Sequence, residues 1–201
     1  MRCELISWPQ MYDLARRLAL AVRAAGPFPD LIVAVARGGY VPARILADFL
    51  DVMDLTDLKV EHYRGAHRMG AARVRYPLRA GVDGRRVLVV DDVTDTGDTF
   101  DVALSHIRSL GTPAALHTAV LHHKTVARLE PDFHAAVVNR WRWIIYPWAA
   151  MEDLTGFARE MQPPPSSVQA LDEHLKREYG LHVPRPLLED VLLLLSQTDS
   201  R

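Results

Sequence analysis

The chain has 201 residues, enough for one α/β domain with a sizeable core and a small addition. Its 24 basic and 25 acidic residues give a formal net charge of −1, so no overall field favours nucleic acid or an anionic membrane as a partner. No secretory signal and no apolar run of about 18 residues is present. The single cysteine, Cys3, excludes an internal disulfide, and we expect a cytoplasmic protein.

Helical and strand patterns alternate along most of the chain. The runs at 31–36, 87–90 and 114–121 are β-branched or apolar, which is typical of parallel strands buried on both faces. The sequence therefore predicts an α/β fold, a mostly parallel twisted sheet flanked by helices. Strands are predicted at 31–36, 57–63, 74–78, 87–90 and 114–121, and helices after Ser7, at 41–50 and from Thr99 onward.

The C-terminal part differs in composition. Three consecutive prolines begin at Pro163, which favours a stiff linker because proline cannot continue a helix. Amphipathic helices are predicted at 168–179 and 186–196. The expected organisation is a main domain over 1–160, a linker over 161–167 and a C-terminal helical extension over 168–201.

The strand at 87–90 stops at paired carboxylates, Asp91 and Asp92, where ligands bind in open α/β sheets. The loop 94–99 that follows is rich in Thr and Asp, and Gly97 permits close backbone approach. It leads into a helix whose free N–H groups favour a phosphate. The alternative is a turn whose Asp and Thr residues only cap the helix. A Walker loop is excluded because its spacing and its lysine are absent.

Two other connections carry candidate anion ligands. Arg37-Gly38-Gly39 follows the strand at 31–36 and either holds an anion on backbone N–H groups or forms an ordinary turn. The polar segment at about 64–73 contains Arg64, Arg68 and Arg73, and we expect a mobile loop there; the alternative is a solvated basic loop.

The strand at 114–121 ends at His122-His123-Lys124. A zinc site on the two histidines is disfavoured, because neighbours on a strand point to opposite faces and no third ligand follows at a suitable spacing. The segment 135–148 is the most aromatic part of the chain, and aromatic residues at this density usually belong to a core.

The run from Val89 to Thr99 resembles the signature of type I phosphoribosyltransferases, which bind 5-phosphoribosyl-1-pyrophosphate (PRPP). Arg142-Trp143-Ile144-Ile145-Tyr146-Pro147-Trp148 resembles the base-recognition segment of the xanthine-guanine members, and we place that region at about 122–153. One departure is that Ala149 stands where that pattern has an acid. Glu152 or Asp153 is the candidate replacement.

The resemblance implies an enzyme of purine salvage that transfers the phosphoribosyl group from PRPP to N9 of xanthine, guanine or hypoxanthine and releases pyrophosphate. It implies a small base-binding hood beside the sheet, Mg²⁺ as cofactor and a homo-oligomer, dimer or tetramer. The implied roles are 5-phosphate binding by Asp95, Thr96, Gly97, Asp98 and Thr99, ribose and Mg²⁺ binding by Asp91 and Asp92, pyrophosphate binding by Arg37, Gly38, Arg64 and Arg68, purine binding by Lys124, Trp143 and Ile144, and catalysis by Asp95 near purine N7.

Two alternatives stay open. The chain could be a non-catalytic regulator on the same fold that senses PRPP or a nucleotide, although no basic stripe marks the C-terminal extension as a nucleic-acid surface. It could also be a pyrimidine or adenine phosphoribosyltransferase. Lys124 with Trp143 favours a 6-oxopurine through the resemblance alone.

Overall fold

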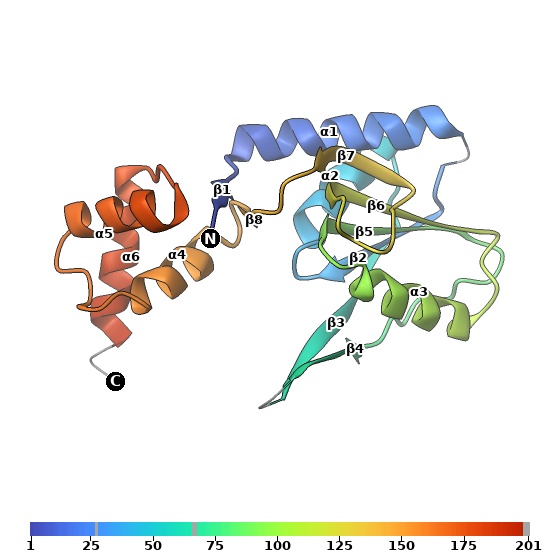
Figure 1. Ribbon diagram of the computed structural model, residues 1–201. Helices are drawn as coiled ribbons and strands as arrows, with labels where there is room; N and C mark the ends of the chain where they lie inside the picture. Colours follow the sequence, from blue (N-terminus) through green and yellow to red (C-terminus); the bar gives the residue numbers. More distant parts are fainter. Residues whose placement is uncertain (27, 66–67, 199–201) are drawn as a thin grey trace. The chain divides into compact units, whose positions relative to one another are not determined.

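The computed structural model describes residues 1–26, 28–65 and 68–198, and the chain divides into two compact units. The sheet unit comprises residues 12–140, and the helical unit comprises residues 1–11 and 141–201. Figure 1 shows the elements of both units in chain colours. Helix α1 (Trp8–Ala25) begins in the helical unit and continues into the sheet unit.

The sheet unit is built on six strands in the order β4-β3-β2-β5-β6-β7. All neighbouring pairs are parallel except β3 and β4, which are antiparallel, so the mostly parallel sheet predicted from the sequence is confirmed. Besides α1, the elements of this unit are β2 (Leu31–Ala36), α2 (Tyr40–Leu50), β3 (Leu55–Gly65), β4 (Arg68–Tyr76), β5 (Arg86–Thr94), α3 (Asp98–Leu110), β6 (Ala115–Lys124) and β7 (Phe133–Val138).

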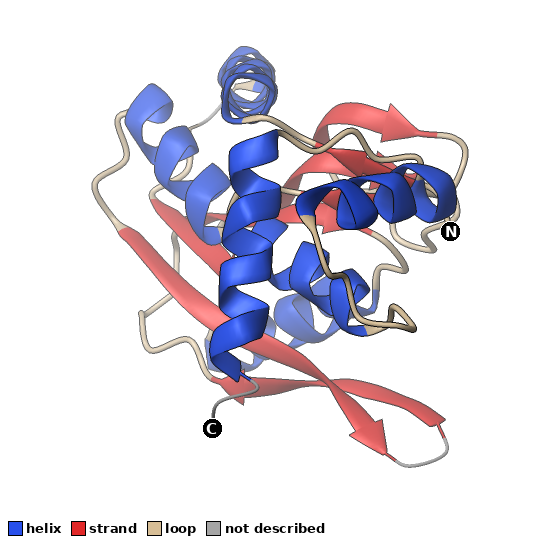
Figure 2. Ribbon diagram, turned by 90° about the vertical axis from the view of Figure 1, so that its left-hand side faces the viewer, coloured by secondary structure: helices blue, strands red, loops and turns tan. Residues whose placement is uncertain are grey.

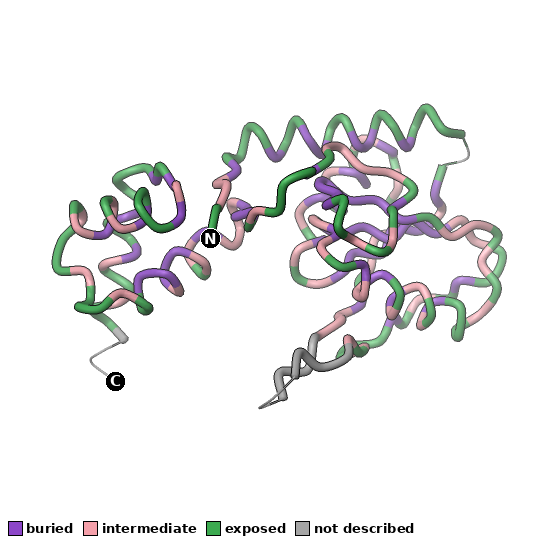
Figure 3. Tube along the Cα trace, in the orientation of Figure 1, coloured by how far each residue is buried: buried purple, intermediate pink, exposed green. Residues whose placement is uncertain are grey.

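The core of the sheet unit lies on both faces of the central strands, which are buried over most of their length (Figure 3). Helix α3 covers one face, where Phe100 and Ile107 are fully buried against Val89. Helix α1 lies on the opposite side of the sheet in Figure 1. Complete burial of one such large side chain stabilises a fold by roughly 1.5–3 kcal/mol. This packing holds the carboxyl ends of β2, β5 and β6 at one edge of the sheet.

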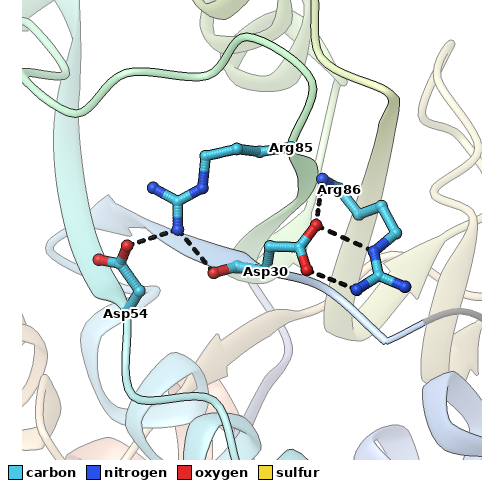
Figure 4. A network of polar contacts seen from close by, with 4 residues as sticks. All are labelled: Asp30, Asp54, Arg85 and Arg86. Atoms are coloured by element: carbon cyan, nitrogen blue, oxygen red, sulfur yellow. Dashed lines mark hydrogen bonds and ion pairs between the residues drawn. The ribbon is translucent and has the colours of Figure 1, made fainter.

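A polar network joins the starts of two central strands (Figure 4). The backbone N–H and Nε of Arg86 donate to Asp30 Oδ2 at 2.8 and 2.9 Å, and Arg85 donates to the Asp30 carbonyl oxygen at 2.7 Å. Arg85 also pairs with Asp54. The hydrogen bonds from Arg86 hold the pKa of Asp30 well below its ordinary value. The network fixes β5 against β2 at the edge opposite the predicted site.

The segment expected to be a connecting loop over about 64–73 consists largely of strand. β3 continues to Gly65 and β4 begins at Arg68, so the two form a long hairpin (Figure 2). The two strands form an antiparallel ladder in which, for example, Glu61 pairs with Arg73. Such a ladder satisfies backbone N–H and C=O groups that a loop would leave to solvent, which favours long strands here. Residues 66–67 lie outside the described part.

The helical unit contains a two-stranded parallel sheet and a group of helices. Its elements are β1 (Cys3–Leu5), β8 (Trp143–Ile145), α4 (Ala150–Arg159), α5 (Val168–His174), a π-helical turn η1 (Leu175–Tyr179) and α6 (Arg185–Thr198). Leu154 and Phe157 of α4 share one core with Leu171, Leu175 and Leu188 of the C-terminal helices. The compact unit therefore combines β8 and α4 with the predicted extension, although we placed a boundary at 161–167.

No helix in the described ranges is long and apolar enough to cross a bilayer.

Candidate functional site

The predicted anion-binding residues of the sheet unit gather where β2, β5 and β6 end. These three strands are parallel neighbours, so their carboxyl ends meet at the same edge of the sheet. In open α/β sheets this edge is where ligands bind. The connections that leave it are the glycine loop after β2, the Asp/Thr loop after β5 and the segment after β6.

Asp91 and Asp92 form an acidic pair near the end of β5. Asp91 is buried, and its Oδ1 accepts the backbone N–H of Asp92 at 2.9 Å. Burial, followed by the charge of Asp92, raises the pKa of Asp91 well above its ordinary value. Two neighbouring carboxylates in such surroundings are stabilised by a cation or by hydroxyl donors, the groups that a sugar phosphate and Mg²⁺ supply.

The glycine loop lies directly against this pair. A Cβ at Gly38 would overlap the carboxylate of Asp92, and a Cβ at Gly39 would overlap the Val90 carbonyl oxygen. Any other residue would therefore push the loop away from β5. The structure brings together the predicted pyrophosphate loop and the predicted ribose carboxylates.

The Asp/Thr loop enters α3 through Gly97, whose φ of 98° lies in the left-handed region that favours glycine. The Thr96 hydroxyl accepts the N–H of Asp98 at 3.3 Å. Helix α3 has 13 residues, so its dipole and the free N–H groups of its first turn favour an anion at this end. The anion cradle predicted over 95–99 lies at this position.

The segment after β6 folds onto the same loop and contributes a residue that the sequence did not indicate. The N–H of Arg128 donates to the Thr96 carbonyl oxygen at 2.9 Å, and its guanidinium group pairs with Asp98. Leu129 lies beside Gly97, where a Cβ would be 2.8 Å from the Leu129 Cβ. Arg128 thus compensates the charge of Asp98, which lies in the predicted anion loop. No periodic pattern or motif marks this residue, which is 30 positions away from Asp98 in the chain.

Lys124 and Asp95 form an ion pair between the ends of β6 and β5. Lys124 Nζ lies 3.0 Å from Asp95 Oδ1, with 3% of the lysine side chain and 41% of the aspartate side chain exposed. A buried ammonium group needs such a partner, because removing it from water alone is costly. Two residues that the sequence reasoning linked to different atoms of a purine therefore contact each other.

The histidines that precede Lys124 lie within β6, which extends to residue 124 and does not end at residue 121. His122 and His123 are buried. Burial, followed by the neighbouring His134, lowers the pKa of His123. Within the described ranges no group of three or more His, Cys, Asp or Glu side chains could hold a metal ion.

The predicted arginines of the 64–73 segment are placed only by their backbone. Arg64 pairs with Met69 and Arg68 with Gly65 near the end of the β3–β4 hairpin. The side chains of both arginines fall outside the described part of the structure. Their contact with pyrophosphate remains a prediction.

Two of the predicted purine-binding residues, Trp143 and Ile144, lie in the helical unit, whereas Lys124 lies in the sheet unit. Trp143 begins β8 and pairs in register with Cys3, and 37% of it is exposed, whereas Ile144 is buried. Trp148 stacks on Tyr146 with ring centroids 4.8 Å apart, so it belongs to an aromatic cluster. Burial raises the pKa of Asp153 in the first turn of α4, and hydrogen bonding from the Trp143 side chain acts in the opposite direction.

Comparison with known proteins relates this arrangement to one family. The family model for the phosphoribosyl transferase domain matches residues 2–151. A xanthine-guanine phosphoribosyltransferase of Cereibacter sphaeroides is 31% identical over 149 residues, which cover 71% of this chain and 84% of the relative.

Solved structures agree with this relationship. A purine phosphoribosyltransferase from Pyrococcus horikoshii superposes with a TM-score of 0.65 at 31% identity, covering 74% of this chain and 95% of that one. The xanthine-guanine-hypoxanthine phosphoribosyltransferase of Helicobacter pylori, at 21% identity and a TM-score of 0.65, shares the fold. The match of the family model and the acidic pair with its anion loop lead to one conclusion: the chain belongs to the phosphoribosyl transferase domain family.

Proposed function

We propose that the chain transfers the 5-phosphoribosyl group from PRPP to N9 of a 6-oxopurine, namely xanthine, guanine or hypoxanthine, and releases pyrophosphate. The observation that supports this most directly is the Lys124–Asp95 pair, because it sets a buried cation and a carboxylate beside the anion loop. The relative from C. sphaeroides is a xanthine-guanine phosphoribosyltransferase, which agrees with this substrate class.

In the proposed reaction the bond between C1 of the ribose and pyrophosphate breaks while N9 of the purine bonds to C1. The electron pair of the broken bond leaves with pyrophosphate, and positive charge develops on the sugar ring. The protein therefore has to hold two anions apart and stabilise the cation between them. The anion loop after β5 and the glycine loop after β2 are the two candidate anion sites.

Each loop has a defined task in this proposal. The backbone N–H groups over 95–99, with the hydroxyls of Thr96 and Thr99, hold the 5-phosphate. Asp91 and Asp92 accept hydrogen bonds from the 2- and 3-hydroxyls of the ribose. Arg37 and the backbone at Gly38 bind pyrophosphate, joined by Arg64 and Arg68 from the hairpin, whose closure would exclude water from the sugar cation.

The purine is held from its edge and its face. Lys124 donates to O6, and Asp95 takes the proton that N7 releases during synthesis and returns it in the reverse reaction. Trp143 stacks on the ring, and the backbone of Ile144 meets the purine edge. The 3.0 Å contact sets the proposed donor to O6 and the proposed proton acceptor side by side.

Mg²⁺ fits the acidic pair. Asp91 is buried beside a second carboxylate, which leaves negative charge that a hard cation would neutralise. Because no third carboxylate or histidine joins the pair among the described residues, the remaining ligands would be substrate oxygens and water. Bound there, the ion would supply charge neutralisation for pyrophosphate.

The test is an assay with PRPP and Mg²⁺ against hypoxanthine, guanine, xanthine, adenine and uracil in parallel. We expect nucleoside monophosphate from at least one 6-oxopurine and little from adenine or uracil. Product from none of the five would favour the regulator that binds PRPP or a nucleotide without catalysis. We also propose a cytoplasmic homo-oligomer, dimer or tetramer, that uses PRPP and a purine base.

A further inference from the structure

The glycine loop, residues 37–39, connects the end of β2 to the start of α2. β2 lies between β3 and β5 in the sheet, so the loop leaves the sheet with a neighbouring strand on each side. On the β5 side, Gly38 packs against the Asp92 carboxylate and Gly39 against the Val90 carbonyl oxygen. A contact on the β3 side would therefore hold the loop between both neighbours.

Tyr40 supplies that contact. It is the first residue of α2 and follows the loop directly, and its hydroxyl donates a hydrogen bond to the Asp57 carboxylate of β3. Asp57 is in register with Ala34 of β2, two residues before that strand ends, so the acceptor lies on the strand beside the loop. The same hydrogen bond raises the pKa of the Tyr40 hydroxyl, which keeps it protonated near neutral pH. The start of α2 is thereby linked to β3.

The backbone of the loop shows which donor this contact can orient. The Gly39 N–H donates to the Val35 carbonyl oxygen at 2.8 Å, and the Tyr40 N–H donates to the Arg37 carbonyl oxygen at 3.3 Å. Both groups are therefore used inside the connection between β2 and α2. The N–H of Gly38, the group proposed to bind pyrophosphate, lies next to them in the chain, so its direction follows the placement of Tyr40.

The exposure of the pair argues against a mainly stabilising role. Tyr40 is 45% exposed, and Asp57 is exposed as well. A polar contact at such a surface generally adds little to the stability of a fold. Asp57 also brings a negative charge close to the loop proposed to bind an anion, where charge alone would weaken binding. The contact is better explained by the position that it gives the loop.

We propose that Tyr40 is a positioning residue for the glycine loop, and that its hydrogen bond to Asp57 holds the Gly38 N–H toward pyrophosphate. This inference rests on the proposed function, in which the loop binds the pyrophosphate part of PRPP. Because Tyr40 acts through the loop, loss of its hydroxyl should weaken the binding of pyrophosphate and PRPP and leave the use of the purine unchanged.

The test is calorimetric titration of the full chain with pyrophosphate in the presence of Mg²⁺. Tyr40→Phe removes only the hydroxyl and should weaken pyrophosphate binding about fivefold, the effect of losing one typical hydrogen bond. In steady-state kinetics the KM for PRPP should rise by a similar factor, while the KM for guanine stays within about twofold. Unchanged pyrophosphate affinity in Tyr40→Phe would overturn the proposal.

Variants of Asp57 separate position from charge. Asp57→Ala removes a negative charge, which would strengthen anion binding if charge alone mattered, whereas loss of the acceptor should weaken it about fivefold. Asp57→Asn keeps an acceptor oxygen and should bind pyrophosphate as well as the unmodified chain. In the Tyr40→Phe background, Asp57→Ala should cause no further weakening. Tighter binding by Asp57→Ala, or equal losses in both backgrounds, would contradict the positioning role.

Tyr12→Phe is the matched control, because it makes the same change at an exposed tyrosine of α1. Its pyrophosphate affinity should stay within about twofold of the unmodified chain, and a loss equal to that of Tyr40→Phe would also count against the proposal. The titration needs no turnover. If no purine yields product but Tyr40→Phe still weakens pyrophosphate binding, the proposed function fails while the role of Tyr40 stands.

Discussion

At the scale of single residues, the Lys124–Asp95 pair links two roles that sequence reasoning treated separately. The 3.0 Å contact means that removing either partner changes the electrostatics of the other. The two roles are therefore told apart by comparing what each single variant does to purine use and to PRPP binding.

Asp95→Ala should lower kcat by about 10²–10⁴, the range of general acid–base catalysis, with a smaller effect on PRPP binding. Lys124→Ala should impair the use of 6-oxopurines and leave PRPP binding intact. Steady-state kinetics with guanine and calorimetric titration with PRPP measure the two effects, and thermal unfolding checks that each variant folds. Unchanged kinetics with 6-oxopurines in both variants would contradict the assigned roles.

The Asp98–Arg128 pair gives a second prediction at this scale. Arg128→Ala leaves the Asp98 charge uncompensated beside the proposed phosphate site, so the KM for PRPP should rise several-fold. Asp98→Ala added to Arg128→Ala removes that repulsion and should recover most of the loss. The effect should weaken as salt increases, because the pair is exposed. A double variant worse than Arg128→Ala alone would show that Asp98 has another task.

The site residues that could be predicted from the sequence are those whose role follows from their neighbours in the chain. Gly38, Asp91 and Gly97 follow strand ends in chain order, so their pattern signals an anion site before any contact is known. Arg128 acts through a contact with Asp98 that only the fold creates, and no local pattern indicates it.

At the scale of elements, the strands and helices of the central sheet follow their apolar periodicity closely. The observed strands differ from the predicted ones where hydrogen-bonded pairing with a neighbouring strand, and not apolar periodicity, determines where a strand begins and ends. β1 has three residues, too few for a pattern, and exists because it pairs with β8. β6 continues through His122 to Lys124 because β5 and β7 pair with it there. The β3–β4 hairpin extends for the same reason.

The Asp30–Arg86 contact at the start of β5 gives a prediction at this scale. The pKa of Asp30 is lowered from its ordinary value of 3.8, first by its hydrogen bonds to Arg86. A carboxyl group with a lowered pKa in the folded state contributes stability that is complete above the unfolded value and is lost as pH falls below it. Asp30→Asn should therefore lower the melting temperature at pH 7 and flatten its decline in acid.

The control for this variant is Asp13→Asn, which removes a surface carboxylate paired with Arg16 and Arg17 on α1. Thermal unfolding followed by circular dichroism between pH 3 and pH 7 compares the two. Asp13→Asn should change the melting temperature less, because its ion pairs are confined to one exposed helix. Equal curves for both variants would show that the Asp30 network adds no more than a surface pair.

At the scale of the whole molecule, the packing of the C-terminal helices is a feature that composition alone does not predict. The prolines from Pro163 onward suggest a boundary, yet α4 before them and α6 after them share a core. Sequence patterns show that α6 has an apolar face but not which element covers it. The C-terminal helices, most of which lie beyond the 2–151 match to the family model, are therefore part of the unit that contains Trp143.

This arrangement leads to a prediction that separates the two units. Leu188→Ala on α6 removes a buried side chain from the core shared with Leu154 of α4, and should destabilise the helical unit by about 2–5 kcal/mol. Leu193→Ala, on the same helix with 59% of the residue exposed, is the matched control and should have little effect. Because Trp143 belongs to the same unit, Leu188→Ala should raise the KM for the purine at temperatures near its lowered transition, while calorimetric titration still detects PRPP binding by the sheet unit. Parallel loss of purine use and PRPP binding in Leu188→Ala would show instead that the two units unfold together.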